Sequence, residues 1–260
     1  MGEFPDLWNL RQPDRVAEVA RAYVAAGSQI ILTNTFGANR LRLREHSLEE
    51  KTREINQRGV EISLEAAAGR AKVFGSIGPS GKMLLSGDII PEELQRAFGE
   101  QARALAEGGA EGLVIDTMSD LEEAKLAIAA ARATGLPVVA CMVFDSGKAK
   151  DRTMMGQTPE QVAKGLTDAG ADVIGANCGQ GIEGFVPICQ RLHASTDRPI
   201  WIKANAGLPM VVDGQAQYNI TPDAFASFVP SLIAAGASFI GGCCGTSPEF
   251  ITAVARRMGP

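Results

Sequence analysis

The stretch "AGADVIGANC" (169–178) joins the end of a helix to a buried strand, and three other stretches match it without gaps. They are "AGSQIILTNT" (26–35), "GGAEGLVIDT" (108–117) and "AGASFIGGCC" (235–244). Each begins with small residues that end a helix, continues as an apolar run and closes on polar or thiol side chains. Repeated helix–strand units of this kind predict a parallel sheet.

Apolar strand candidates recur along the whole chain, and helical patterns separate them. The predicted strands are 28–36, 72–78, 112–118, 137–144, 172–178, 199–205 and 238–244. Most are continuous apolar runs, as expected for parallel strands buried on both faces. The pattern predicts an α/β fold, a (β/α)8 TIM-type barrel that lacks its first strand, over a single domain of residues 1–260.

The start of the chain raises a question for that barrel, because the pattern opens on a helix. Pro13 begins the helical pattern, and the strand that would precede it is missing. Either "MGEFPDLW" (1–8) partly substitutes for the strand, although Pro5 weakens that reading, or the chain starts at an internal methionine, or a partner covers the gap.

Composition excludes several classes of protein. A net charge of −5 argues against a nucleic-acid-binding surface. No apolar run reaches the roughly 18 residues that a membrane helix needs, and no signal peptide pattern opens the chain. We therefore expect a cytoplasmic location, with no membrane contact. The oligomeric state stays open, a homo-oligomer included.

Two columns of the aligned stretches carry the chemistry. One holds Asn34, Asp116, Asn177 and Cys243, and the next holds Thr35, Thr117, Cys178 and Cys244. These positions end alternate strands, at the face where such barrels build their active sites. Three of the five cysteines fall in the two columns, which general polarity at strand ends does not explain.

Cys178, Cys243 and Cys244 are therefore predicted to converge as zinc ligands. Three thiolates suit Zn²⁺ and leave one tetrahedral position open for an exchangeable ligand. A zinc ion with this donor set activates an incoming thiol better than it activates water, which predicts methyl transfer or alkylation at sulfur. Cys141 and Cys189, which lie in apolar runs, are interpreted as core residues.

The motifs "GANCGQG" (175–181) and "GGCCGT" (241–246) resemble the zinc signatures of the homocysteine S-methyltransferase family. "TNTFGANR" (33–40), "IDTMSDLEEA" (115–124) and "GQTPEQVA" (156–163) resemble its methionine-synthase branch. The resemblance implies zinc at the three cysteines, homocysteine or a related thiol as substrate, and methionine as product. It also implies a methyl donor, which is a separate corrinoid protein, S-methylmethionine or a betaine.

The same resemblance places substrate contacts. Asp116 stands where the family often has glutamate, so its carboxylate would face the ammonium group of the substrate, with a shorter reach. Asn34, Ser76 and Asn177 are further predicted polar contacts.

Two alternatives stay open. The chain is a catalytically impaired zinc-binding homologue if the missing strand is essential. It is a Schiff-base aldolase if Lys203, near a strand end, is the reactive group.

Overall fold

The computed structural model describes residues 4–207, 210–212 and 215–259. The chain divides into two compact units. The first consists of Met1–Met118, Glu122–Ala140 and Ala169–Ala171, and the second of Ser119–Leu121, Cys141–Asp168 and Asp172–Pro260. The expectation of a single domain over residues 1–260 stays a prediction.

Seven strands form the main sheet, in the order β1-β2-β3-β4-β5-β6-β9. They are β1 (Ile30–Leu32), β2 (Lys72–Ile77), β3 (Gly112–Met118), β4 (Val138–Met142), β5 (Val173–Gly181), β6 (Ile200–Asn205) and β9 (Ala237–Gly242). Each overlaps one of the seven ranges expected from the sequence, which confirms an α/β fold with these strands. Among the described residues no strand precedes β1. The finding therefore covers seven strands and does not extend to a closed eight-stranded barrel.

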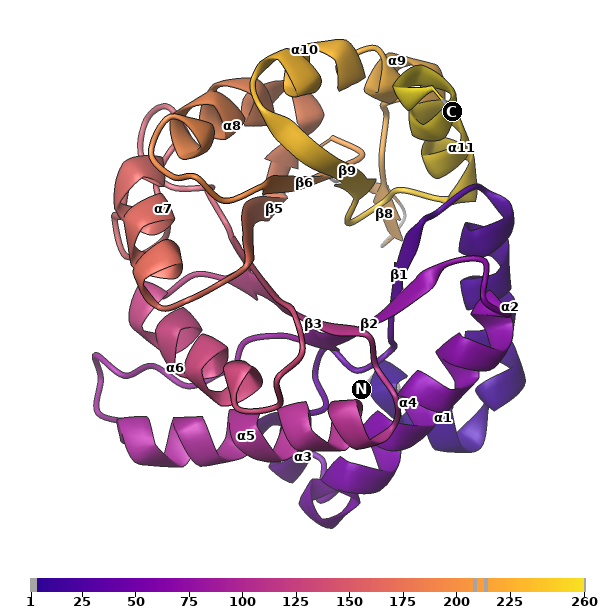
Figure 1. The fold of residues 1–260 in the computed structure, drawn as a ribbon, viewed down its shortest axis with the longest axis vertical. Coiled ribbons are helices and arrows are strands. Elements are labelled where there is room, and N and C mark those ends of the chain that lie inside the picture. Colours follow the sequence, from indigo (N-terminus) through magenta and orange to yellow (C-terminus); the bar gives the residue numbers. More distant parts are fainter. Residues whose placement is uncertain (1–3, 208–209, 213–214, 260) are drawn as a thin grey trace. The chain divides into compact units, whose positions relative to one another are not determined.

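In the first unit, β1 pairs with β2 and β2 with β3, all parallel. Helices pack against these strands and against one another (Figure 1). The helical elements up to β4 are η1 (Pro5–Leu7), α1 (Trp8–Arg11), α2 (Pro13–Ala25), α3 (Arg40–Arg44), η2 (Glu49–Lys51), α4 (Thr52–Ala67), α5 (Pro91–Glu107) and α6 (Leu121–Arg132). The apolar side chains of β3 are fully buried, as the continuous apolar run "GLVI" predicts.

In the second unit, β5 pairs with β6 and β6 with β9, again parallel. The register sets Asn177 beside Lys203, and Lys203 beside Gly241. Helices α8, α10 and α11 pack on these strands (Figure 1). The helical elements after β4 are α7 (Pro159–Asp168), η3 (Ile182–Gly184), α8 (Phe185–His193), α9 (Pro222–Ala226), α10 (Val229–Ala234) and α11 (Pro248–Met258).

Two features differ from the sequence-based expectation. Strands β7 (Met210–Val212) and β8 (Gln215–Gln217) form an antiparallel hairpin that the pattern did not predict. In the N-terminal stretch 1–8, the described residues 4–8 contain no strand: Pro5–Leu7 is a 3-10 helix that runs into α1, while residues 1–3 lie outside the described residues. The amide of Asn9 in α1 donates to the carbonyls of Asn34 and Ile55, which fixes this helical segment to the first unit.

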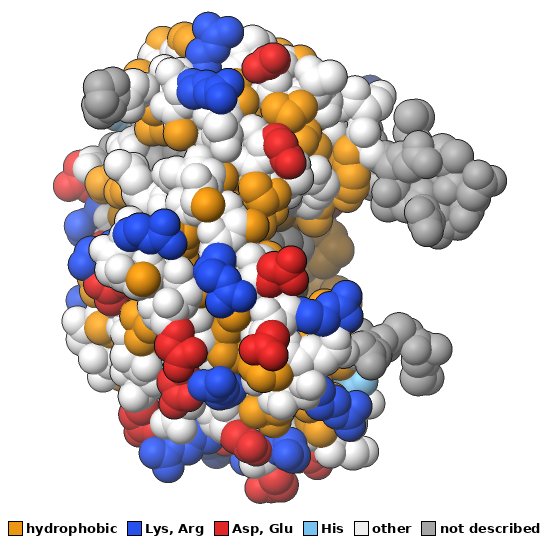
Figure 2. Space-filling model, turned by 90° about the vertical axis from the view of Figure 1, so that its right-hand side faces the viewer, with side chains coloured by type: hydrophobic (Ala, Val, Ile, Leu, Met, Phe, Trp, Pro, Cys, Tyr) orange, Lys and Arg blue, Asp and Glu red, His pale blue; other side chains and the backbone are white. Residues whose placement is uncertain are grey.

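Charged side chains of both signs are interleaved on the face drawn in Figure 2.

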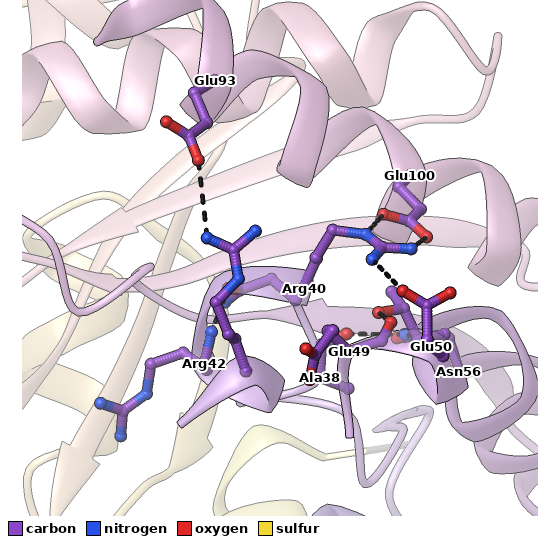
Figure 3. A network of polar contacts seen from close by, with 11 residues as sticks. Ala38, Arg40, Arg42, Glu49, Glu50, Asn56, Glu93 and Glu100 are labelled. Carbon is purple, nitrogen blue, oxygen red and sulfur yellow. Dashed lines mark hydrogen bonds and ion pairs between the residues drawn. The ribbon is translucent and has the colours of Figure 1, made fainter. Parts of the chain in front are cut away.

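In the first unit, Arg40 of α3 binds Glu100 of α5 through Nε at 2.7 Å and Nη2 at 3.0 Å, and Glu50 of η2 through Nη1 at 3.0 Å (Figure 3). The hydrogen bonds that Arg40 donates to Glu100 and Glu50 raise the pKa of its guanidinium above its ordinary value. This bidentate pair links the start of α3 to the long helix α5. None of the described helices has both the length and the apolarity that crossing a bilayer requires.

Candidate metal centre

Three cysteines of the second unit meet at one point. The sulfur atoms of Cys178, Cys243 and Cys244 all lie within 4.8 Å of one another. The Sγ of Cys178 is 3.8 Å from the Sγ of Cys244, which is 4.0 Å from the Sγ of Cys243. Cys178 and Cys243 are half-buried and Cys244 is exposed, so the cluster opens to solvent. The three thiols that the repeat predicted to converge therefore do lie together, and the cluster can hold a metal ion.

The backbone at Cys178 is bent to aim its thiol. Cys178 has a φ of 60°, in the left-handed region that side chains with a Cβ rarely adopt, and Gly179 follows with a φ of 75°. The pairing of β5 with β6 changes register between Asn177 and Gly181. Such a bulge re-aims a side chain at a strand end. Thr117, at the equivalent repeat position of β3, has a φ of 59°, so two of the four aligned positions share this backbone conformation, whereas Thr35 and Cys244 do not.

Hydrogen bonds fix the turn that carries the other two cysteines. The N–H of Cys243 donates to the carbonyl of Ala204 at 2.8 Å, and the N–H of Ala206 to the carbonyl of Cys244 at 2.9 Å. The Thr246 hydroxyl donates to the Cys243 carbonyl at 2.7 Å. A side chain at Gly242 would collide with Thr246, since an added Cβ would lie 2.2 Å from its Oγ1. The small residues around the cysteine pair thus allow the turn to fold tightly against β6.

Two asparagines contact the sulfur cluster. The side-chain N–H of Asn177 donates to the Sγ of Cys243 at 3.7 Å, and that of Asn205 to the Sγ of Cys178 at 3.8 Å. The side-chain oxygen of Asn205 also accepts from the N–H of Cys244 at 3.1 Å. Asn177 was predicted from the repeat. Asn205 was missed, although its place at the end of the β6 run "IWIKAN" was a usable signal.

Tyr218 is a second residue that sequence reasoning missed. Its ring lies against Gly245, where an added Cβ would be 2.4 Å from the ring carbon Cγ. Burial and then the nearby cysteines raise the pKa of the Tyr218 hydroxyl. The ring therefore flanks the turn next to Cys244.

The three thiols of the cluster differ in the direction in which their pKa values shift. Hydrogen bonds from Cys243 and Cys244 lower the pKa of Cys178 far below that of a free thiol. Hydrogen bonding to Cys178 raises the pKa of Cys243 and also that of Cys244. Cys189 behaves differently, because burial raises its pKa to about 12. It is buried in α8 as predicted, and Cys141 is buried in β4.

The other predicted contacts belong to the first unit. Asp116 is buried near the end of β3, and Ser76 is buried near the end of β2. The side-chain N–H groups of Asn34 donate to the Pro5 carbonyl at 2.8 Å and to the Asn9 side chain at 3.2 Å, which ties down the N-terminal helices. A role for Asp116, Ser76 and Asn34 in binding substrate stays a prediction.

The family model for homocysteine S-methyltransferases matches residues 3–258. The chain belongs to the homocysteine S-methyltransferase family. This membership confirms the resemblance drawn from the paired cysteine motifs.

Curated relatives include the methionine synthases of Mycobacterium leprae and Mycobacterium tuberculosis. They are 29% and 28% identical over 97% of this chain. The chain spans only 22% of the length of each of these relatives. Among solved structures, the metallated homocysteine methyltransferase MmuM from Escherichia coli matches with a TM-score of 0.81 and 23% identity. The match covers 99% of this chain and 90% of that one, and it shows a shared fold.

Proposed function

We propose that this chain transfers a methyl group to the thiol of homocysteine, giving methionine, with a zinc ion held by Cys178, Cys243 and Cys244. The observation that carries the proposal is the spacing of the three sulfurs. Sulfur ligands at about 2.3 Å from a tetrahedral zinc ion lie about 3.8 Å apart. The Cys178–Cys244 and Cys244–Cys243 distances of 3.8 Å and 4.0 Å fit that geometry.

The donor set fits the chemistry as well as the geometry. A bound zinc ion with three thiolate ligands keeps an incoming thiol deprotonated near neutral pH while leaving it a soft nucleophile. The half-buried positions of Cys178 and Cys243 and the exposed Cys244 give an outside thiol access to the cluster. The bent backbone at Cys178 and the bonded turn at Cys243 hold the sulfurs in place before substrate arrives, which reduces reorganisation on binding.

The reaction is a displacement at carbon. The sulfur of homocysteine, as a thiolate, supplies the electron pair of the new S–CH3 bond, and the bond between methyl and donor breaks with its electrons leaving on the donor. The proton of the thiol leaves to solvent before this step. In this proposal Asp116 binds the ammonium group of the substrate, and Asp116→Asn is expected to raise KM for homocysteine more than it lowers kcat.

We propose a corrinoid protein as the methyl donor, supported by the similarity to the methionine synthases. S-methylmethionine and a betaine are the competing donors. Comparing methionine formation from a methylated corrinoid protein, S-methylmethionine and betaine at equal concentration decides among them.

The test of the function uses two cysteine variants. Cys243→Ala removes one proposed ligand, and Cys189→Ala removes a buried cysteine outside the cluster. We expect the unaltered chain and Cys189→Ala to bind about one equivalent of zinc and to form methionine, as one tetrahedral site predicts, and Cys243→Ala to lose both. Full turnover by metal-free protein would contradict the proposal.

Of the two alternatives, the surroundings of Lys203 argue against the aldolase, whereas the impaired homologue stays open to test. The Lys203 ammonium lies 5.2 Å from the centre of the Trp201 ring. This contact stabilises the charged amine, whereas a Schiff base needs the neutral one. Displacement of the fourth zinc ligand by homocysteine separates an active enzyme from an impaired zinc-binding homologue.

A further inference from the structure

The cysteine cluster poses a problem of selectivity for the proposed reaction. When homocysteine binds beside Cys178, Cys243 and Cys244, the methyl donor meets protein thiolates as well as the substrate thiolate. All are sulfur nucleophiles of the same type. Methylation of a protein sulfur would spoil the metal site, so something must favour the substrate sulfur.

Two protein sulfurs accept an amide N–H, and the contacts come from different strands. Asn177, in β5, donates to Cys243 at 3.7 Å, and Asn205, at the end of β6, donates to Cys178 at 3.8 Å. Asn177 is fully buried and Asn205 nearly so, which protects both hydrogen bonds from competition with water. A hydrogen bond to a thiolate is charge-assisted, and it weakens when the sulfur gains a methyl group and loses its charge. Such a donor therefore raises the barrier to methylation of the sulfur that it contacts.

Cys244 differs from the other two cysteines. It is the most exposed of the three, and within residues 4–207, 210–212 and 215–259 the side-chain hydrogen bonds of its sulfur are those with the two other thiols, so no asparagine amide donates to it. The hydrogen bond between Asn205 and Cys244 joins the Asn205 side-chain oxygen to the backbone N–H of Cys244, so it is not a bond to the Cys244 sulfur.

We propose that Asn177 is a positioning residue whose N–H shields the Cys243 sulfur from methylation, so that the incoming thiol accepts the methyl group and Cys244 is the protein sulfur most open to side reaction. This inference rests on the proposed function. It assigns Asn177 to the protein sulfur instead of the substrate contact expected from the sequence.

The test measures methylation of the protein itself. The full chain, loaded with zinc and without homocysteine, is treated with methyl iodide: a cysteine sulfur forms the S–CH3 bond while the C–I bond breaks and iodide leaves with the electron pair. Peptide mass spectrometry then gives the rate at each cysteine. Asn177→Leu removes the donor to Cys243, and Asn205→Leu is the matched variant for Cys178.

The expected pattern is specific to each site. In the unaltered chain Cys244 reacts fastest. Asn177→Leu raises the rate at Cys243 about tenfold and leaves Cys178 unchanged, whereas Asn205→Leu raises the rate at Cys178, as expected for losing part of one charge-assisted hydrogen bond. Equal rates at the three cysteines of the unaltered chain, or an unchanged rate at Cys243 in Asn177→Leu, would overturn the proposal.

A second probe separates shielding from simple opening of the structure. N-ethylmaleimide is too bulky to enter a packed site, so it reports exposure. If Asn177→Leu raises N-ethylmaleimide labelling of all three cysteines in parallel, the variant has loosened the cluster and the inference fails. If Asn177→Leu does not fold, Asn177→Ala is measured in its place, and an unchanged methylation rate at Cys243 in that variant overturns the inference. Missing zinc or missing methionine formation would instead refute the proposed function.

Discussion

The left-handed backbone at Cys178 predicts an unusual response to substitution. A residue with a Cβ at a φ of 60° costs roughly 1–2 kcal/mol relative to glycine, which adopts this conformation freely. Glycine also has more freedom in the unfolded chain, which costs roughly 0.4–1 kcal/mol. The first effect is larger, so Cys178→Gly is expected to be more stable than Cys178→Ala by about 1 kcal/mol. Both variants lack the thiol, so their difference isolates the backbone.

Cys244 supplies the matched control. It is a ligand candidate in the same cluster, but its φ is not positive. Glycine there should be less stable than alanine by roughly 0.4–1 kcal/mol, so the sign reverses between the two positions.

Urea unfolding of the four metal-free variants, followed by far-UV circular dichroism, measures these differences. In thermal unfolding 1 kcal/mol corresponds to about 3 °C for a chain of this size. If alanine were the more stable substitution at both positions, Cys178 would not be strained and the argument for a backbone shaped to aim its thiol would fail.

Three further predictions concern stability. Burial raises the pKa of Asp6 to about 6 in the folded chain, so the folded state favours the protonated carboxyl. The resulting stabilisation is complete below about pH 4 and is lost as the pH rises through 6. It amounts to about 3 kcal/mol of unfolding free energy. Asp6→Asn should therefore be more stable than the unaltered chain at pH 7 and not at pH 4. If urea unfolding gave the same difference in unfolding free energy between the two proteins at both pH values, the prediction would be contradicted. Gly245→Ala should lose roughly 2 kcal/mol, because the new Cβ strikes the Tyr218 ring at a φ of 77°, and adding Tyr218→Ala should restore part of that loss in the same assay. Glu100→Gln should cost about 1 kcal/mol by weakening the bidentate pair with Arg40, and a cost that did not shrink in 1 M salt would argue against an ionic origin.

Much of the fold was predictable because parallel strands that are buried on both faces have continuous apolar sequences. The repeat beginning at Ala26, Gly108, Ala169 and Ala235 located the ends of four strands, and the three converging thiols followed from it. The hairpin of β7 and β8 was not predictable in this way, since its strands are three residues long and pair only with each other.

Local geometry at the site was less visible in the sequence. Asn205 lies on a strand that lacks the repeat, so no aligned column pointed to it. The left-handed conformation of Cys178 has no signal in residue type, because cysteine has a Cβ and glycine would be expected there. Ser47 and Glu50 have the spacing of a capping box in the sequence, but Ser47 has a φ of 57° and the helix begins later, at Thr52.

X-ray absorption at the zinc edge, with and without homocysteine, tests the central claim most directly. We predict a zinc ion with three sulfur neighbours from the chain, and a fourth sulfur once homocysteine is added. A chain that retains no zinc, or whose zinc keeps the same neighbours in the presence of homocysteine, would contradict the account.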